Sequence, residues 1–133
     1  MTRLLLDTSA LIAIERRRVD PADLADLDRD DLAMAAISAA ELLVGSELVE
    51  PERREAHRAE VERAIAAVDV IPYDLDTARA HASLVVAARR DGRPRQPHDL
   101  IIAATARATD RVVVTLDRAG FDGLPGVDVR VPA

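Results

Sequence analysis

Four carboxylates each lie beside a short apolar segment, where a strand is expected to end or a helix to begin. They are Asp7 after LLL, Glu41 in SAAELLVG, Asp99 in HDLIIAATA and Asp117 after VVVT. Clustered carboxylates repel one another, and a low-dielectric environment strengthens the repulsion unless a cation neutralises them. Ligand sets made only of oxygen favour hard ions, here Mg²⁺ or Mn²⁺. If the fold gathers these side chains, their types predict a divalent metal site.

Each of the four carboxylates also has an ordinary structural explanation. Asp7 can cap the helix that follows it, and Ser38-Ala-Ala-Glu41 matches a capping box, in which the glutamate bonds back to the cap amide. Asp99 would favour the dipole in the first turn of its helix, and Asp117 can bond its own backbone in a turn. These explanations leave open why all four should gather at one edge of a sheet.

The residues that other metal sites and nucleophilic mechanisms require are absent or wrongly spaced in this sequence. The chain has no cysteine and no lysine, since all 18 basic residues are arginine. This excludes thiol nucleophiles, Cys-ligated zinc, phosphate loops of the GxxxxGK type and Schiff-base chemistry. The three histidines, His57, His81 and His98, do not have the spacing of zinc ligands. His98 precedes Asp99 but points about 100° away around a helix, so we interpret it as a surface residue, with an outer position at the metal site as the alternative.

Length and composition predict one globular domain. The chain has 133 residues, so a single domain over residues 1–133 is expected. Apolar residues make up 49% and aromatic residues only 2%, which predicts an aliphatic core with few rings on which bases could stack. The net charge of −6 argues against a broad nucleic-acid-binding surface. No apolar run reaches the ~18 residues of a membrane span, and we expect a soluble cytoplasmic protein.

Strand and helix signals alternate along the chain. Short apolar runs predict strands over residues 3–6, 32–37, 69–72, 111–115 and 127–131. Capping residues and apolar spacing predict helices over residues 9–17, 20–29, 38–45, 51–68, 75–90 and 97–109. The alternation predicts an α/β fold, a three-layer sandwich with a mostly parallel central sheet. Ligands bind such folds at the carboxyl ends of the strands, where the four carboxylates are expected.

The runs LLLDTSALIA, ISAAELLVG, HDLIIAATA and VVVTLDRAGF, in this order, resemble the PIN domain and, within it, the VapC-type toxins of bacterial toxin–antitoxin pairs. The resemblance extends from about Leu4 to Val131. Asp122 is a nearby alternative to Asp117 for the fourth acidic position of the family. The resemblance implies a catalytic, metal-binding acidic cluster with polar support, formed by Asp7, Glu41, Asp99 and Asp117 with Thr8, Ser9 and Thr115.

The resemblance implies a metal-dependent endoribonuclease, in which Mg²⁺ or Mn²⁺ activates a water that attacks an RNA phosphodiester, so that translation is blocked. The implied partners are the RNA substrate, a cognate VapB-type antitoxin and a second copy of the chain, for which the predicted helix over residues 75–88 offers an apolar flank. The alternative is a non-catalytic PIN-like module that binds RNA or protein, although no acidic position is missing. A phosphatase of the aspartyl-phosphate type would need an aspartate in place of Ser9 and a later lysine.

Basic charge is concentrated in the connector RRDGRPRQP, residues 89–97, just before Asp99. We expect Arg93 and Arg95 to contact the RNA or a partner, because guanidinium groups bind phosphates in a bidentate geometry. Arg89 and Arg90 have an equally good alternative explanation, since cations are favoured at the C-terminal end of a helix.

Overall fold

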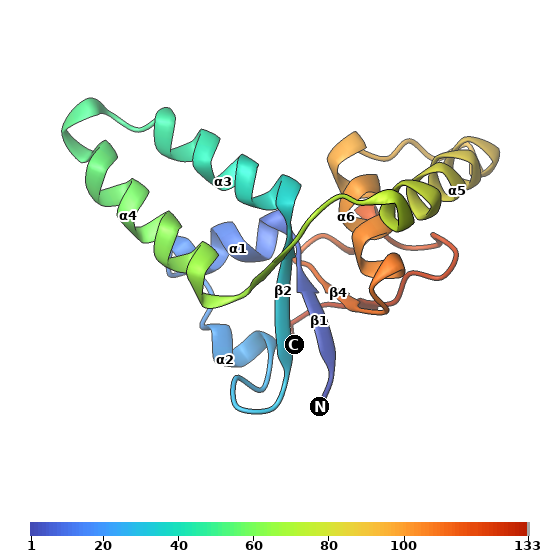
Figure 1. The fold of residues 1–133 in the computed structure, drawn as a ribbon, viewed down its shortest axis with the longest axis horizontal. Helices are drawn as coiled ribbons and strands as arrows, with labels where there is room; N and C mark the ends of the chain where they lie inside the picture. Colours follow the sequence, from blue (N-terminus) through green and yellow to red (C-terminus); the bar gives the residue numbers. More distant parts are fainter. Residues whose placement is uncertain (133) are drawn as a thin grey trace.

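The computed structural model describes residues 1–132 and contains a five-stranded sheet in which all neighbouring strands are parallel (Figure 1). Across the sheet the strands are β3 (Asp69–Ile71), β2 (Asp31–Ala35), β1 (Arg3–Leu6), β4 (Val112–Val114) and β5 (Val129–Arg130). Helices cover both faces of this sheet. The predicted α/β fold with a parallel central sheet is confirmed.

The central strand β1 divides the core into two parts. Its residues Leu4, Leu5 and Leu6 are at most 4% exposed. Leu5 belongs to the apolar cluster on one face of the sheet, and Leu4 and Leu6 belong to the cluster on the other face. A strand that is buried on both faces must be apolar at every position, which explains the LLL run here and the VVV run of β4.

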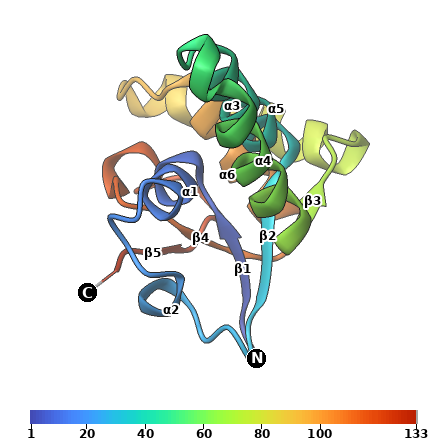
Figure 2. The ribbon, with the colours of Figure 1, turned by 90° about the vertical axis from the view of Figure 1, so that its left-hand side faces the viewer.

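The helices pack on the two faces of the sheet, and some of them extend beyond the carboxyl ends of β1 and β2, where the chain enters α1 and α3 (Figure 2). One face carries α1 (Thr8–Glu15), α2 (Pro21–Leu24), α3 (Ala36–Glu47) and α4 (Pro51–Ala67). The other face carries α5 (Leu75–Asp91) and α6 (Pro97–Ala108), and a short 3₁₀ helix, η1 (Arg118–Gly120), follows β4. The carboxyl edge of the sheet is therefore surrounded by helix N-termini.

The boundary between β2 and α3 differs from the predicted one. β2 ends at Ala35 and α3 begins at Ala36, so Ser38 lies inside the helix, and the capping residue Ala35 makes no side-chain cap bond. The predicted capping box between Ser38 and Glu41 is therefore wrong. The run LAMAAI continues from strand into helix without a polar residue to mark the change, and the packing of the chain sets the boundary instead.

A polar side chain and a glycine determine where α2 and α5 end. The predicted acidic helix after Asp20 stops at Leu24, and the chain turns back because the Asp30 carboxylate accepts hydrogen bonds from the backbone N–H groups of Thr2 and Asp26. In contrast, α5 ends as predicted at Gly92, whose φ of +72° lies in the left-handed region that glycine adopts freely.

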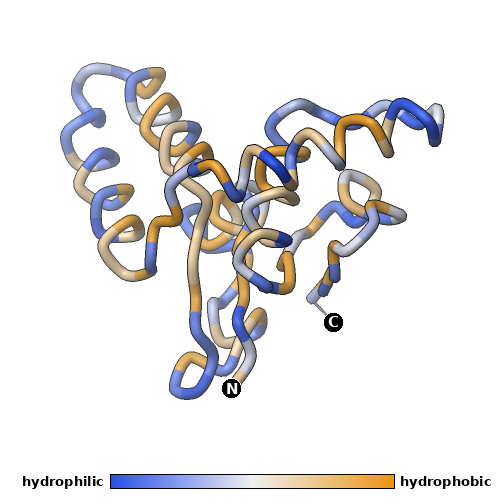
Figure 3. Tube along the Cα trace, turned by 45° about the vertical axis from the view of Figure 1, so that its right-hand side comes forward, coloured by the Kyte–Doolittle hydropathy of each residue, from blue (hydrophilic) through white to orange (hydrophobic). Residues whose placement is uncertain are grey.

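Hydrophobic and hydrophilic segments alternate along the helices (Figure 3), as expected for helices that bury one face against a sheet. Within residues 1–132, no helix is long and apolar enough to cross a lipid bilayer.

Candidate active site

Asp7 follows β1, caps α1 as expected, and is only 3% exposed. Its Oδ1 accepts hydrogen bonds from the Ala10 N–H at 2.9 Å and the Ser9 hydroxyl at 2.7 Å, and its Oδ2 accepts one from the Thr115 hydroxyl at 2.5 Å. Burial raises the pKa of Asp7 above its ordinary value, although these hydrogen bonds favour the charged form. The neighbouring charge of Asp117 raises this pKa further.

Glu41 lies in α3, and both of its carboxylate oxygens have partners from other helices. The Thr8 hydroxyl at the start of α1 donates to Oε1 at 2.9 Å, and Nδ1 of His98 lies 3.4 Å from Oε2. The imidazole is half-exposed, as expected for a surface residue, but it faces Glu41. This contact fits the alternative interpretation of His98, an outer position beside the cluster.

Asp99 lies in the first turn of α6 and is partly buried. Its carboxylate packs against the backbone of η1 so closely that a Cβ atom added to Gly120 would lie 2.7 Å from Oδ2. Burial, and to a lesser degree the charges of Asp7, Asp117 and Glu41, together raise the pKa of Asp99 to about 6. Asp7, Asp117 and Glu41 are therefore close enough to Asp99 to disfavour its ionisation.

Asp117 and Asp122 follow β4, and their surroundings differ. Asp117 caps η1 by accepting from the Ala119 N–H at 3.2 Å, and its own N–H donates to the Thr115 hydroxyl. Its charge raises the pKa of both Asp7 and Asp99. The Asp122 carboxylate instead forms an ion pair with Arg118 at 3.1 Å. These contacts favour Asp117 over Asp122 as the fourth member of the cluster.

The donor set suits a hard divalent cation, because it consists of carboxylate oxygens whose mutual repulsion a cation would relieve. In the described part of the chain, no three histidine, aspartate or glutamate side chains converge closely enough to ligate one ion by themselves. Mg²⁺ usually keeps several waters and takes one or two carboxylates directly. The arrangement therefore suits an ion that some carboxylates bind directly and others bind through water.

The connector residues Arg93 and Arg95 have partners within the protein. The Arg95 guanidinium is 1% exposed and donates to the backbone carbonyls of Arg93 and Asp122 at 3.0 and 2.7 Å. Arg93 also donates to the Asp122 carbonyl, and its guanidinium pairs with Asp91 but stays half-exposed. Both arginines thus join the connector to the segment after η1, and substrate contact by either of them stays a prediction.

The chain is similar to known proteins over nearly its whole length. The family profile of the PIN domain matches residues 4–126. Ribonuclease VapC5 of Mycobacterium tuberculosis is 34% identical over 127 residues, which are 93% of this chain and 91% of that protein. The DNA-bound VapBC structure of Salmonella typhimurium superposes with a TM-score of 0.87 at 26% identity, covering 98% of each chain. VapBC-5 of Mycobacterium tuberculosis, from the VapBC family of toxin–antitoxin systems, gives a TM-score of 0.77 at 28% identity over 100% of both chains.

Proposed function

The chain belongs to the PIN domain family, and from this premise we propose that it is a metal-dependent endoribonuclease, the toxin of a VapBC-type toxin–antitoxin pair. The proteins that it resembles over almost their full length are a VapC ribonuclease and VapBC toxin–antitoxin complexes. The observation that carries the proposal is the group of carboxylates whose burial and mutual repulsion raise the pKa of Asp99 to about 6. A non-catalytic module that binds no metal would not need four carboxylates that repel one another.

We assign the metal and the catalysis to Asp7, Glu41, Asp99 and Asp117, which would hold the ion directly or through water. VapC-type PIN nucleases generally depend on a divalent metal, and the all-oxygen set favours Mg²⁺ or Mn²⁺ here. When bound, such an ion supplies an activated water and positive charge beside the scissile phosphate of RNA.

The polar side chains around the cluster orient its carboxylates. Ser9 and Thr115 hold the two oxygens of Asp7, and Thr8 holds one oxygen of Glu41. Catalytic groups act best when their geometry is fixed before the substrate binds. The three hydroxyls are therefore proposed as positioning groups.

The proposed partners are an RNA substrate, a VapB-type antitoxin and a second copy of this chain. For the homodimer we propose the outer face of α5, where Leu75 and Val86 are 63% and 44% exposed. Action on cellular RNA would place the protein in the cytoplasm. We also propose that residues 1–133 form one PIN-like domain.

Cleavage of a structured RNA by the purified protein tests the proposal. We expect cleavage in millimolar Mg²⁺ or Mn²⁺, and loss of cleavage in excess EDTA or in the Asp7→Asn variant. Asp69→Asn is the matched control, because this exposed aspartate lies at the start of β3, at the opposite edge of the sheet. Equal cleavage in EDTA, or no cleavage under any condition, would count against the proposed function.

A further inference from the structure

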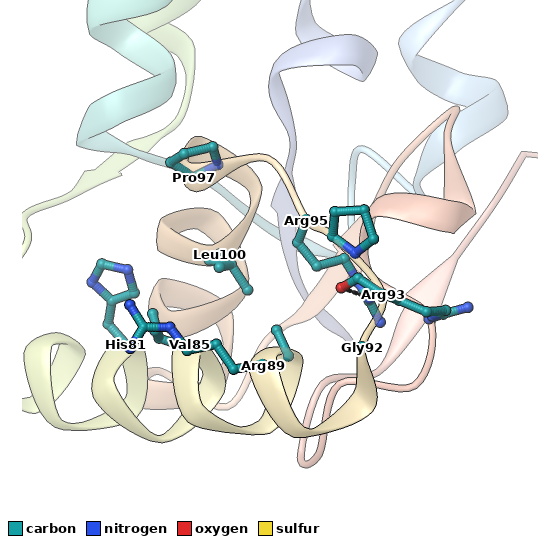
Figure 4. A pocket seen from close by; sticks show the side chains of 10 residues that line it. His81, Val85, Arg89, Gly92, Arg93, Arg95, Pro97 and Leu100 are labelled. Carbon is teal, nitrogen blue, oxygen red and sulfur yellow. Dashed lines mark hydrogen bonds between the residues drawn. The ribbon is translucent and has the colours of Figure 1, made fainter.

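A cavity of about 520 Å³ lies between the C-terminal half of α5 and the first turn of α6 (Figure 4). Its walls are largely apolar and come from Val85 and Ala88 of α5, Leu100 of α6, and the rings of Pro94 and Pro97. The volume lies in the range of pockets that bind small molecules or single groups of larger ones. The metal site does not use this cavity, so its presence requires a separate explanation.

The cavity carries positive charge at its mouth. Arg89 lines it, and in Figure 4 this side chain extends back along α5 toward His81. Arg79 and Arg93 are paired with Asp76 and Asp91, whereas the guanidinium of Arg89 has no carboxylate within ion-pair distance among residues 1–132. No aspartate or glutamate is among the described residues that line the cavity. In a chain of net charge −6, this is a local environment that attracts an anion.

The connector wall of the cavity is built around the buried side chain of Arg95. Its guanidinium is 1% exposed and is held by the backbone carbonyls of Arg93 and Asp122. The Nε–H of Arg95 is buried and has no hydrogen-bond partner within residues 1–132. Buried donors without partners are uncommon and costly. An acceptor atom of a bound group at this wall is one way in which the donor could be satisfied.

The cavity and the metal cluster share the first turn of α6. Pro97 and Leu100 line the cavity, and between them His98 contacts Glu41 while Asp99 belongs to the cluster. One turn of helix rises only 5.4 Å. The cavity and the cluster therefore lie at the same height along the axis of α6, with their residues on different sides of this helix turn.

We propose that this cavity is a subsite that seats one nucleobase of the RNA substrate beside the scissile phosphate, while Arg89 binds an adjoining phosphate. The inference rests on the proposed ribonuclease function and deepens it. A nucleotide combines a flat, largely apolar base with an anionic group, and the apolar walls and unpaired Arg89 complement both parts. His81 can contact the edge of the base, because among residues 1–132 only its Nδ1 is engaged, with the Tyr73 hydroxyl at 2.8 Å.

Four proteins test the subsite: the wild type, Val85→Phe, Arg89→Ala and Arg90→Ala. Val85→Phe fills the cavity from a partly exposed position, and Arg89→Ala removes the charge at its mouth. Arg90→Ala is the matched control, since it removes the same charge at the same helix end from a residue that does not line the cavity. One readout is the base preference around the cut in a random-sequence RNA pool with Mn²⁺. The other is the affinity for labelled hexanucleotides of A, C or U in EDTA, measured at several salt concentrations.

We expect Val85→Phe to flatten the base preference at one position beside the cut and to weaken hexanucleotide binding roughly tenfold, as for the loss of one base contact. Arg89→Ala should weaken binding of all hexanucleotides alike and reduce the salt slope by about 1. Arg90→Ala should match the wild type in base preference. Because Arg89 is exposed, its variant keeps the test informative even if Val85→Phe folds poorly.

The inference is overturned if Val85→Phe and Arg89→Ala bind hexanucleotides and choose cut sites as the wild type does, or if Arg90→Ala has the same effect as Arg89→Ala. A loss of dimer mass or of antitoxin binding in these variants, with RNA readouts unchanged, would assign the cavity to a protein interface instead. Failure of the wild type to cleave any RNA would contradict the proposed function, and hexanucleotide affinity would still decide the subsite.

Discussion

The hydroxyl of Thr115 donates a hydrogen bond to Oδ2 of Asp7 at 2.5 Å and so joins the carboxyl end of β4 to that of β1. Both side chains are buried. The bond favours the charged form of Asp7 against the effect of burial, which raises the pKa of this carboxyl. Two neighbouring strands thus cooperate to keep one buried carboxylate oriented at the edge of the sheet.

Removing this hydroxyl should destabilise the protein and impair the site together. Thr115→Val is expected to cost about 1.5–3 kcal/mol of unfolding free energy at pH 7, because a buried carboxylate loses a donor. The cost should shrink at acidic pH, where Asp7 is protonated. Urea unfolding at pH 7 and at acidic pH measures this, with Thr109→Val as control, since the Thr109 hydroxyl donates to the helix carbonyl of Thr105 and not to a carboxylate of the described residues. Equal costs at both pH values would contradict the role given to the bond.

The metal-free protein should lose stability as pH rises through the titration of Asp99. The pKa of this carboxyl is raised from 3.8 to about 6 in the folded protein, so between these values the folded state binds more protons than the unfolded state. Stability attributable to Asp99 therefore falls from about pH 4 to pH 6 and stays low above. Unfolding in EDTA from pH 4 to 7.5 should show a decline that is steeper in wild type than in Asp99→Asn. Parallel profiles for the two proteins would refute this.

The contact between His98 and Glu41 predicts that His98 affects metal binding without being a ligand. Losing a partner of a metal-binding side chain typically costs about 10- to 100-fold in metal affinity. His98→Ala should weaken Mn²⁺ binding by roughly this factor in a calorimetric titration. His98→Asn should recover part of the affinity, because its amide can still donate to Oε2. Unchanged affinity in His98→Ala would return this residue to the surface role expected from the sequence.

We expect Arg95 to contribute to stability and Arg93 to RNA binding. Arg95→Ala is expected to lower the unfolding free energy by roughly 1–3 kcal/mol, because it removes a buried side chain and the hydrogen bonds that it donates to the carbonyls of Arg93 and Asp122. Arg93→Ala, at a half-exposed position, should change stability little and reduce the salt slope of RNA binding by about 1 if it contacts a phosphate. Thermal melts and salt titrations of both variants decide this. An unchanged salt slope in Arg93→Ala would leave Arg93 with a structural role only.

The fold and the proximity of the four carboxylates could be predicted from sequence because they depend on short, strong signals. The LLL and VVV runs mark buried parallel strands, and an aspartate follows each run, so the topology alone brings Asp7 and Asp117 to one edge. Pro97 fixes the start of α6 and hence the place of Asp99 in its first turn.

The start of α3 and the partners of Glu41 could not be predicted in the same way. The apolar run from Leu32 to Ile37 is compatible with strand or helix throughout, and only packing ends β2 at Ala35. The partners of Glu41, Thr8 and His98, come from α1 and α6, so they depend on how three helices converge. Likewise, no local pattern distinguishes an arginine whose side chain is buried against backbone carbonyls, such as Arg95, from one that faces solvent.

Thermal melts of wild type and Asp99→Asn, each with chelator and with millimolar Mg²⁺ or Mn²⁺, test the metal site most directly. In chelator we expect the variant to be at least as stable as wild type, because it removes a repelling charge. With metal the order should reverse, since only wild type gains fully from binding to the folded state. A variant that is less stable in chelator by about 0.3–1 kcal/mol, and that metal stabilises as strongly as wild type, would mean that Asp99 caps a helix and binds no metal.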